Sequence, residues 1–503
     1  TQQISHLNTM RTDTSPYQAD NGPPPWRTVL AFLLAIFLVP TAYGQQPETV
    51  GQSIHVKLDS RTADRVAPQM EAGVMRAGVP QLDALSAQYG IHRMERVFRP
   101  AGKFEDRHRQ WGLHQWYRVD YKADASPFAV ASAFRTTAGV TSASPVFEKT
   151  LHGQRTNGDD PEPAFTPDDP EYSTQWHYNN TGSTGEPPTV ADSDINLPEA
   201  HDITTGSPDV VISIIDSGLD LAHPEFEGML WINECEDIDN DGVYTSADLN
   251  GVDDDGNGFV DDVVGYDHAS NAPLATGAPA GDESHGTHVA GTVAAKNNNG
   301  LFGAGVAGGD GSPDSGVRLM INQTFNPGGG GFAEGIVYSA DMGAVVSQNS
   351  WGYQTPGVFD QPVLDAIDYF RANAGGTDAP IDGGIFVNSA GNSNSGDDYY
   401  PGFYEGSFAV TSTEDTDTKS SFSNYGDWVD VAAPGGEFGA DGVWSTVIGG
   451  FGSLSGTSMA APHVSGVIGL IASQTPGLTN DQIETLLINT GKDISANQPE
   501  RMG

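Results

Sequence analysis

Only one cysteine, Cys235, occurs among the 503 residues of the sequence. A single thiol cannot form a disulfide within the chain, so stability has to come from the hydrophobic core and from any metal that the protein binds. Nothing in the neighbouring sequence indicates that Cys235 is activated as a nucleophile, and we interpret it as a structural or incidental residue.

Basic residues are also scarce: 23 Lys and Arg stand against 66 Asp and Glu, which gives a formal net charge of −43 at pH 7. A surface this acidic repels nucleic acid and anionic membranes, so neither is an expected partner. The charge fits a soluble extracellular protein, a protein that holds cations, or one adapted to high salt, and charge alone does not choose among the three.

Long apolar runs are nearly absent. The run VLAFLLAIFLV at 29–39 is shorter than the roughly 18–20 residues that a membrane span needs. The small residues Ala42 and Gly44 follow it, which is the layout of a secretory signal peptide cleaved before Gln45. We therefore interpret residues 1–44 as an N-terminal extension with a signal peptide, and we expect a secreted product without a membrane partner once the signal is removed.

Residues 45–150 are expected to form a small α+β domain. Alternating residues predict strands at 52–59 and 115–122, and apolar spacing predicts helices at 79–89 and 127–137. This pattern is compatible with a β-α-β-β-α-β order, as in ferredoxin-like folds. The polar, Pro- and Asp-rich stretch 151–170 that follows is expected to be an exposed linker.

After residue 170, short runs rich in Val and Ile alternate with helical stretches. Runs that are apolar on both faces are typical of buried parallel strands, so 171–503 is expected to be an α/β domain with a mostly parallel sheet. Strands are expected at 210–215, 317–321, 344–350 and 384–390. Helices are expected at 286–296, 332–342, 360–374, 459–473 and 480–490, the last with a capping box of Thr479 and Gln482.

An acid, a base and a nucleophile lie in three separate contexts. Asp216 ends the run VVISII and would face the crevice at the carboxyl edge of the sheet. His285 begins a helix of small residues, and Ser458 lies where exposed helix N–H groups would stabilise an oxyanion. Each also has a simpler interpretation: a turn-capping Asp, one half of a metal-binding His pair, and a serine N-cap.

Together, the segments ISIIDSGLDLAHPEF, ESHGTHVAGTVAA and LSGTSMAAPHVSG closely resemble the subtilisin-like serine endopeptidases (subtilases, peptidase family S8), in which Asp, His and Ser occur in this order. The resemblance implies a three-layer subtilisin-like fold. It implies that Asp216 orients His285, that His285 rather than His288 is the base, and that Ser458 forms an acyl-enzyme. It also implies that Asn392, in the turn SAGN, donates to the oxyanion, although a plain turn asparagine is the alternative.

The resemblance extends to the parts around the triad. It implies that 45–150 is an inhibitory, chaperone-like propeptide removed by cleavage within 151–170, while an ordinary accessory domain remains the alternative. It implies that Ser350, Trp351 and Gly352 line the main side-chain pocket. Gly330, Gly331 and Phe332 are implied to lie where an edge strand pairs with an extended peptide. The four glycines 328–331 depart from the family pattern, so the resemblance does not assign the outer substrate subsites.

An acidic insertion lies between Asp216 and His285. From Asn233 to Asp267 there are twelve Asp or Glu and no Lys or Arg. Alternate oxygen side chains with a glycine bend let a short loop wrap Ca²⁺, and the segment GVDDDGNGFVDDVVGYD resembles a calcium-binding insertion of secreted subtilases. The candidate ligands are Asp237, Asp239, Asp241 and Asp248 in one loop, and Asp253, Asp255, Asn257, Asp261 and Asp262 in the next. A solvated acidic loop is the alternative.

These features predict a secreted, self-processing and monomeric serine endopeptidase with structural Ca²⁺, acting on proteins or peptides. One rival is a catalytically inactive, calcium-dependent binding module on the same scaffold, which an altered triad position would have indicated. A lipase or esterase is the other, but it would carry a G-x-S-x-G elbow and place the histidine last. Here the nucleophile segment is GTSMA, and the candidate base His285 precedes it.

Overall fold

The structure is a computed structural model of the chain. It describes residues 49–151, 154–156, 167–183, 189–275, 284–325, 330–375, 379–439 and 442–494. The chain divides into two compact units, 1–46 and 47–503, and all described residues belong to the second. The predicted signal peptide at 29–39 lies outside the described residues and stays a prediction. Within the described ranges, no helix combines the length and the apolar character needed to cross a bilayer.

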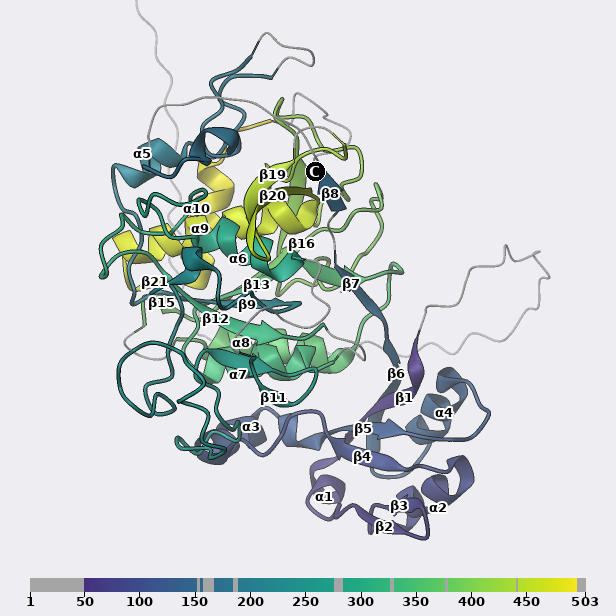
Figure 1. Ribbon diagram of the computed structural model, residues 1–503. Helices are drawn as coiled ribbons and strands as arrows, with labels where there is room; N and C mark the ends of the chain where they lie inside the picture. Colours follow the sequence, from purple (N-terminus) through teal and green to yellow (C-terminus); the bar gives the residue numbers. More distant parts are fainter. Residues whose placement is uncertain are drawn as a thin grey trace, which may run out of the picture. The chain divides into compact units, whose positions relative to one another are not determined.

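The N-terminal part of the second unit contains a four-stranded antiparallel sheet in the order β4-β5-β1-β6 (Figure 1). Its main elements are β1 (Thr49–Leu58), α2 (Pro80–Tyr89), β4 (Arg93–Arg96), β5 (Trp116–Asp120), α4 (Pro127–Arg135) and β6 (Val140–Phe147). They follow one another in the expected β-α-β-β-α-β order. The shorter elements are α1 (Ser60–Ala63), β2 (Gln69–Glu71), β3 (Val74–Arg76), η1 (Gly102–Phe104), α3 (Glu105–Gln110) and η2 (Leu113–Gln115).

This sheet has a hydrophobic core of its own. Val56 of β1 and Val119 of β5 are buried and pack in one cluster with Leu82 of α2 and Phe134 of α4. Such a cluster is what an independently folding α+β domain needs. The domain limits given above remain predictions.

A second, eight-stranded sheet forms the centre of the α/β part, in the order β11-β10-β12-β9-β13-β16-β17-β18. Its strands are β9 (Val211–Asp216), β10 (Gly265–Asp267), β11 (Ala272–Pro273), β12 (Arg318–Gln323), β13 (Val346–Asn349), β16 (Ile385–Ser389), β17 (Phe408–Thr413) and β18 (Val431–Pro434). Every pairing is parallel except that of β10 with β11. The expected α/β class with a mostly parallel sheet is therefore confirmed.

Helices cover both faces of this sheet (Figure 1). The helices α6 (His285–Ala294) and α9 (Thr457–Gln474) share one core cluster with Ile212 and Ile214 of β9. The helices α7 (Phe332–Asp341) and α8 (Gln361–Asn373) share a second cluster with Ile215 of the same strand. Neighbouring residues of β9 thus face opposite layers, which explains why the strand is apolar along its whole length.

Smaller elements complete the α/β part. They are η3 (Tyr172–Thr174), α5 (Leu197–His201), η4 (Pro224–Phe226), β14 (Trp351–Tyr353), β15 (Ile381–Asp382), β19 (Val443–Val447), β20 (Gly450–Ser455), β21 (Leu478–Thr479) and α10 (Asn480–Thr490). All four predicted strands and all five predicted helices of this part occur within two residues of their expected bounds. The capping box of Thr479 and Gln482 is present in both directions.

The N-terminal part docks on α7 and α8 through ion pairs. At the end of α7, Asp341 contacts Arg107 and also His108, whose Nε2 lies 2.6 Å away. On α8, Asp365 lies 2.6 Å from the ammonium of Lys57. The charge distribution favours this arrangement: residues 49–156 hold 15 of the 23 Lys and Arg, whereas 171–503 hold 6 against 48 Asp and Glu.

Candidate active site

Asp216 and His285 form a hydrogen bond at the carboxyl edge of the central sheet. Asp216 is the last residue of β9 and His285 the first of α6, and 2.8 Å separates Asp216 Oδ1 from His285 Nδ1. Both side chains are buried. Because a carboxylate only accepts, Nδ1 carries the proton and the lone pair of the neutral ring resides on Nε2. His288, one turn further on, is fully buried, bonds the Val443 carbonyl, and has its pKa lowered by burial to about 3.

A glycine lets α6 approach the turn after β9. The N–H of Gly286 donates to Ser217 Oγ at 3.0 Å. A Cβ at position 286 would lie 2.1 Å from the carbonyl oxygen of Gly218, a distance that no side chain tolerates without a backbone shift. The contact between the acid and the base therefore depends on a residue without a side chain.

Ser458 is the second residue of α9 and is fully buried in the intact chain. Its hydroxyl donates to the carbonyl oxygen of Ser350 at 3.0 Å. Among the described residues no hydrogen bond joins Ser458 to His285. The structure thus brings Ser458 to the start of a helix, as expected, but with its hydroxyl turned toward Ser350, between β13 and β14.

The orientation of Asn392 follows from its partner. The backbone N–H and the hydroxyl of Thr457 both bond Asn392 Oδ1, at 3.0 and 2.8 Å. Because a backbone N–H can only donate, the amide oxygen has to face Thr457, and the NH₂ group points away from it. Asn392 therefore presents a donor beside the residue that precedes Ser458.

A buried hydrogen-bond chain that the sequence analysis missed supports the serine. Ser465 Oγ donates to Gln348 Oε1 at 2.6 Å, and Gln348 Nε2 donates to Ser350 Oγ at 2.8 Å. Ser350 Oγ in turn donates to the carbonyl of Ser458 at 2.8 Å. All four residues are fully buried. Ser350, predicted as a pocket residue, thus also holds the backbone of Ser458.

Two of the predicted substrate-binding residues, Trp351 and Gly352, lie beside residues 149–151 of the same chain. Trp351 and Gly352 belong to β14, which pairs antiparallel with β7 (Lys149–Leu151). Phe332 begins α7 rather than an edge strand, and its ring packs edge-on against Trp351 with centroids 4.5 Å apart. Gly330 and Gly331 precede it, and the neighbouring positions 326–329 lie outside the described residues.

A second strand that follows β7 in the chain also lies close to Ser458. The strand β8 (Gln154–Thr156) pairs antiparallel with β20, whose last residue, Ser455, is close in sequence to Ser458. In Figure 1 the chain runs from β6 through β7 to β8 beside β20. Residues 149–151 and 154–156 are therefore extended strands that pair with two segments next to Ser458, β14 and β20.

In the first acidic loop the structure gathers three of the four candidate ligands. Asp237, Asp239 and Asp248 each offer an oxygen within 4.8 Å of the others. Asp237 and Asp248 are buried, and each has one carboxylate oxygen without a hydrogen-bond partner among the described residues. Asp241 stays outside this group and bonds the backbone N–H of Val243 instead.

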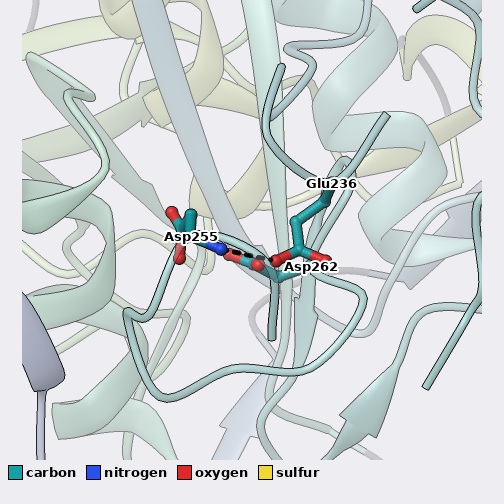
Figure 2. Close-up of side chains that lie close together, drawn as sticks. All are labelled: Glu236, Asp255 and Asp262. Carbon is teal, nitrogen blue, oxygen red and sulfur yellow. Dashed lines mark hydrogen bonds between the residues drawn. The ribbon is translucent and has the colours of Figure 1, made fainter. Parts of the chain in front are cut away.

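The second acidic cluster contains a residue that the sequence analysis did not select. Figure 2 shows Glu236 with Asp255 and Asp262, and their oxygens lie within 4.8 Å of one another. Glu236 is fully buried, and its Oε2 has no hydrogen-bond partner among the described residues. Burial raises the pKa of Glu236 and that of Asp262 to about 7. Oxygen ligands gathered in this way fit a hard cation such as Ca²⁺.

The other candidate ligands of the second loop form hydrogen bonds within it. Asp253 accepts from the N–H groups of Asn257 and Gly258. Asp261 accepts from those of Asn250 and Gly251. The Asn257 amide donates to Asp255 and Asp262. Glu236 lies directly before the first loop yet faces the second, so spacing within one loop could not reveal it.

The sequence model of the subtilase family matches residues 207–503. Thermitase of Thermoactinomyces vulgaris is 33% identical over 66% of this chain and 93% of its own length. The halolysin-like extracellular serine protease Nep of Natrialba magadii is 32% identical over 67% of this chain, which spans only 50% of Nep.

Among solved structures, fervidolysin of Fervidobacterium pennivorans, described as a keratinolytic enzyme related to subtilisin, has a TM-score of 0.56 at 21% identity. The match covers 90% of this chain and 59% of fervidolysin. Because residues 171–503 are a smaller share of the chain than this, the match has to include residues before 171. At this identity it is a likeness of fold alone.

We predict that Gly286→Ala lowers the free energy of unfolding by about 1–3 kcal/mol, since the new methyl group collides with the Gly218 carbonyl. Gly450→Ala is the matched control, because a Cβ there has nothing within 4 Å. Thermal unfolding of both variants and the parent measures the difference. Equal melting temperatures for the two variants would contradict the close approach.

Proposed function

Because the chain belongs to the subtilase family of serine endopeptidases, we propose that it hydrolyses peptide bonds in proteins with Asp216, His285 and Ser458. The observation that carries the proposal is the buried 2.8 Å hydrogen bond between Asp216 and His285 at the sheet edge where Ser458 begins a helix.

In the proposed mechanism, the Ser458 hydroxyl turns from the Ser350 carbonyl toward His285, which takes its proton at Nε2 as Oγ attacks the peptide carbonyl. Asp216 holds the ring in the required tautomer and stabilises the imidazolium. His285 then gives the proton to the leaving amine, and an acyl-enzyme remains at Ser458. Water, activated by the same histidine, releases the acid.

Asn392 and the N–H of Ser458 are the proposed oxyanion donors. The contact with Thr457 supports this role, because it engages Asn392 Oδ1 and so leaves the NH₂ group, a donor, on the side of the amide that does not face Thr457. A donor aimed at the oxyanion acts on the transition state more than on the bound substrate.

We expect Asn392→Ala to lower kcat about 10²–10³-fold with little change in KM, since one oxyanion donor is lost. Asn392→Asp is the informative second variant, because it keeps an oxygen for Thr457 but removes the NH₂ donor. Steady-state kinetics on a peptide, with melting temperatures alongside, separates the two roles. Full activity in Asn392→Asp would exclude the donor role.

We also propose that residues 45–150 form a propeptide and that the enzyme cleaves itself between Leu151 and Gln154, within the linker expected from the sequence. Two pairings support this site: 149–151 lies along the wall that includes Trp351, and 154–156 lies along β20. The residues between them, His152 and Gly153, are outside the described ranges. An extended segment paired on both sides of a nucleophile resembles a bound substrate.

The intact mass of the secreted protein tests self-processing. We expect the wild type to lose everything before residues 152–154, while Ser458→Ala, expressed in parallel, retains it because no acyl-enzyme can form. Identical shortening of both proteins would assign the cut to a host protease. If neither is shortened and neither cuts peptides, the inactive binding module becomes the better description.

Both acidic clusters are proposed to hold structural Ca²⁺. Support comes from the buried carboxylate oxygens of Glu236, Asp237 and Asp248 that lack partners among the described residues, since such groups are costly to bury without a cation. A cation that binds only the folded state stabilises it, by about 2.7 kcal/mol at a concentration of 100 Kd.

We expect a calcium chelator to lower the melting temperature, and Glu236→Gln to remove one binding site in a calorimetric Ca²⁺ titration. Glu234→Gln is the matched control, because Glu234 is exposed in the same loop. A titration in which the two variants bind equally would remove Glu236 from the ligand set.

Secretion and a monomeric state complete the proposal. The extracellular relative Nep supports secretion. Proteins or peptides are the proposed substrates, and the propeptide is the proposed internal partner.

A further inference from the structure

Lys149, on the strand that lies along β14, has its ammonium in a pocket of the α/β part. Its Nζ lies 2.7 Å from Asp360 Oδ2, and the two side chains are 7% and 1% exposed. The same Nζ lies 4.9 Å from the ring centroid of Phe332 and 4.7 Å from that of Tyr353. A carboxylate with two aromatic faces is a strong binding environment for a cation.

Three residues around the ammonium belong to the α/β part, and the ammonium also donates to the carbonyl of Phe147 in its own segment at 3.3 Å. Phe332 is the first residue of α7, Tyr353 ends β14, and Asp360 directly precedes α8. The backbone N–H of Asp360 donates to the Tyr353 hydroxyl at 3.0 Å, which holds the acid beside the ring. The pocket walls therefore remain when the N-terminal part is removed.

Among the described residues, the ion-pair partners of Asp360 are Lys149 and His55. The Nδ1 atom of His55 lies 4.0 Å from Asp360 Oδ1. Burial lowers the pKa of His55 to about 4, so this ring is neutral near pH 7. Asp360 Oδ1 has no hydrogen-bond partner among the described residues, and a two-pronged guanidinium would therefore find a second acceptor.

The backbone of Lys149 is paired with β14 as the backbone of an extended peptide substrate would be. Lys149 pairs with Tyr353, and Leu151 pairs with Trp351 at the other end of the same short ladder. A substrate that adds the same strand to β14 brings the corresponding side chain into the same pocket, because alternate side chains of a strand face the same side. This step rests on the proposed peptidase function.

We propose that this pocket is a subsite for Lys or Arg on the amino side of the scissile bond, and that Asp360 determines the specificity. An apolar side chain at this position leaves a buried carboxylate without a counter-ion, whereas a basic side chain satisfies it. Substrates carrying a base at the position of Lys149 are therefore cut in preference to otherwise identical peptides.

A purely structural role for Lys149, as an anchor of the N-terminal part, predicts no such preference in separate peptides. The test uses the secreted wild-type enzyme and a synthetic peptide with the sequence of residues 145–158. A second peptide replaces Lys149 by norleucine, which keeps the four-carbon chain and lacks the charge. At low salt we expect kcat/KM to favour the lysine peptide about tenfold or more.

Asp360→Asn should reduce this preference to within about twofold, because it lowers kcat/KM for the lysine peptide and raises it for the norleucine peptide, which no longer faces an unpaired carboxylate. Asp365→Asn is the matched control, because Asp365 also pairs with a lysine of the N-terminal part, Lys57, at 2.6 Å. It should keep the full preference for the lysine peptide.

Equal cleavage of both peptides by the wild type would overturn the subsite, whether or not the Asp360 variant folds. Loss of the preference in both variants would overturn the assignment to Asp360 and indicate a general effect of charge. Failure to cut either peptide would instead contradict the proposed peptidase function.

Discussion

The candidate site depends on how closely a helix can approach the end of a buried strand. Asp216 reaches the His285 ring only because α6 begins directly against the turn that follows β9. At that point the backbone of Gly286 lies against Gly218, where a Cβ would be 2.1 Å from the carbonyl oxygen. The parallel sheet supplies the other half of the constraint, because it collects strand ends at one edge. The helix that carries Ser458, α9, shares a core cluster with α6.

Much of the α/β part could be predicted because its signals are local. The run VVISII is apolar on both faces, and β9 does lie between two helical layers. The capping box of Thr479 set the start of α10 to the residue. The candidate triad residues stood in long characteristic sequence segments, and the structure brings Asp216 and His285 together.

What could not be predicted depends on contacts between distant segments. Gln348 and Ser465 are 117 residues apart, and nothing in either neighbourhood reveals that they share a hydrogen bond. Glu236 faces a cluster built by residues that come later in the chain. Phe332 was expected on an edge strand but begins a helix, with Gly331 at φ 77° before it, a conformation that glycine adopts at little cost.

The pairings of β7 and β8 connect the N-terminal part to the candidate site within one continuous chain. If the site binds substrates as proposed, the N-terminal part of the whole chain competes with them at a fixed effective concentration, which no change in protein concentration alters. If the enzyme cuts between the two strands as proposed, the same contacts join two separate molecules. The fraction of enzyme that holds the cleaved N-terminal part then depends on concentration. Dilution outside a cell would therefore favour enzyme with an unoccupied site, without any further chemical step.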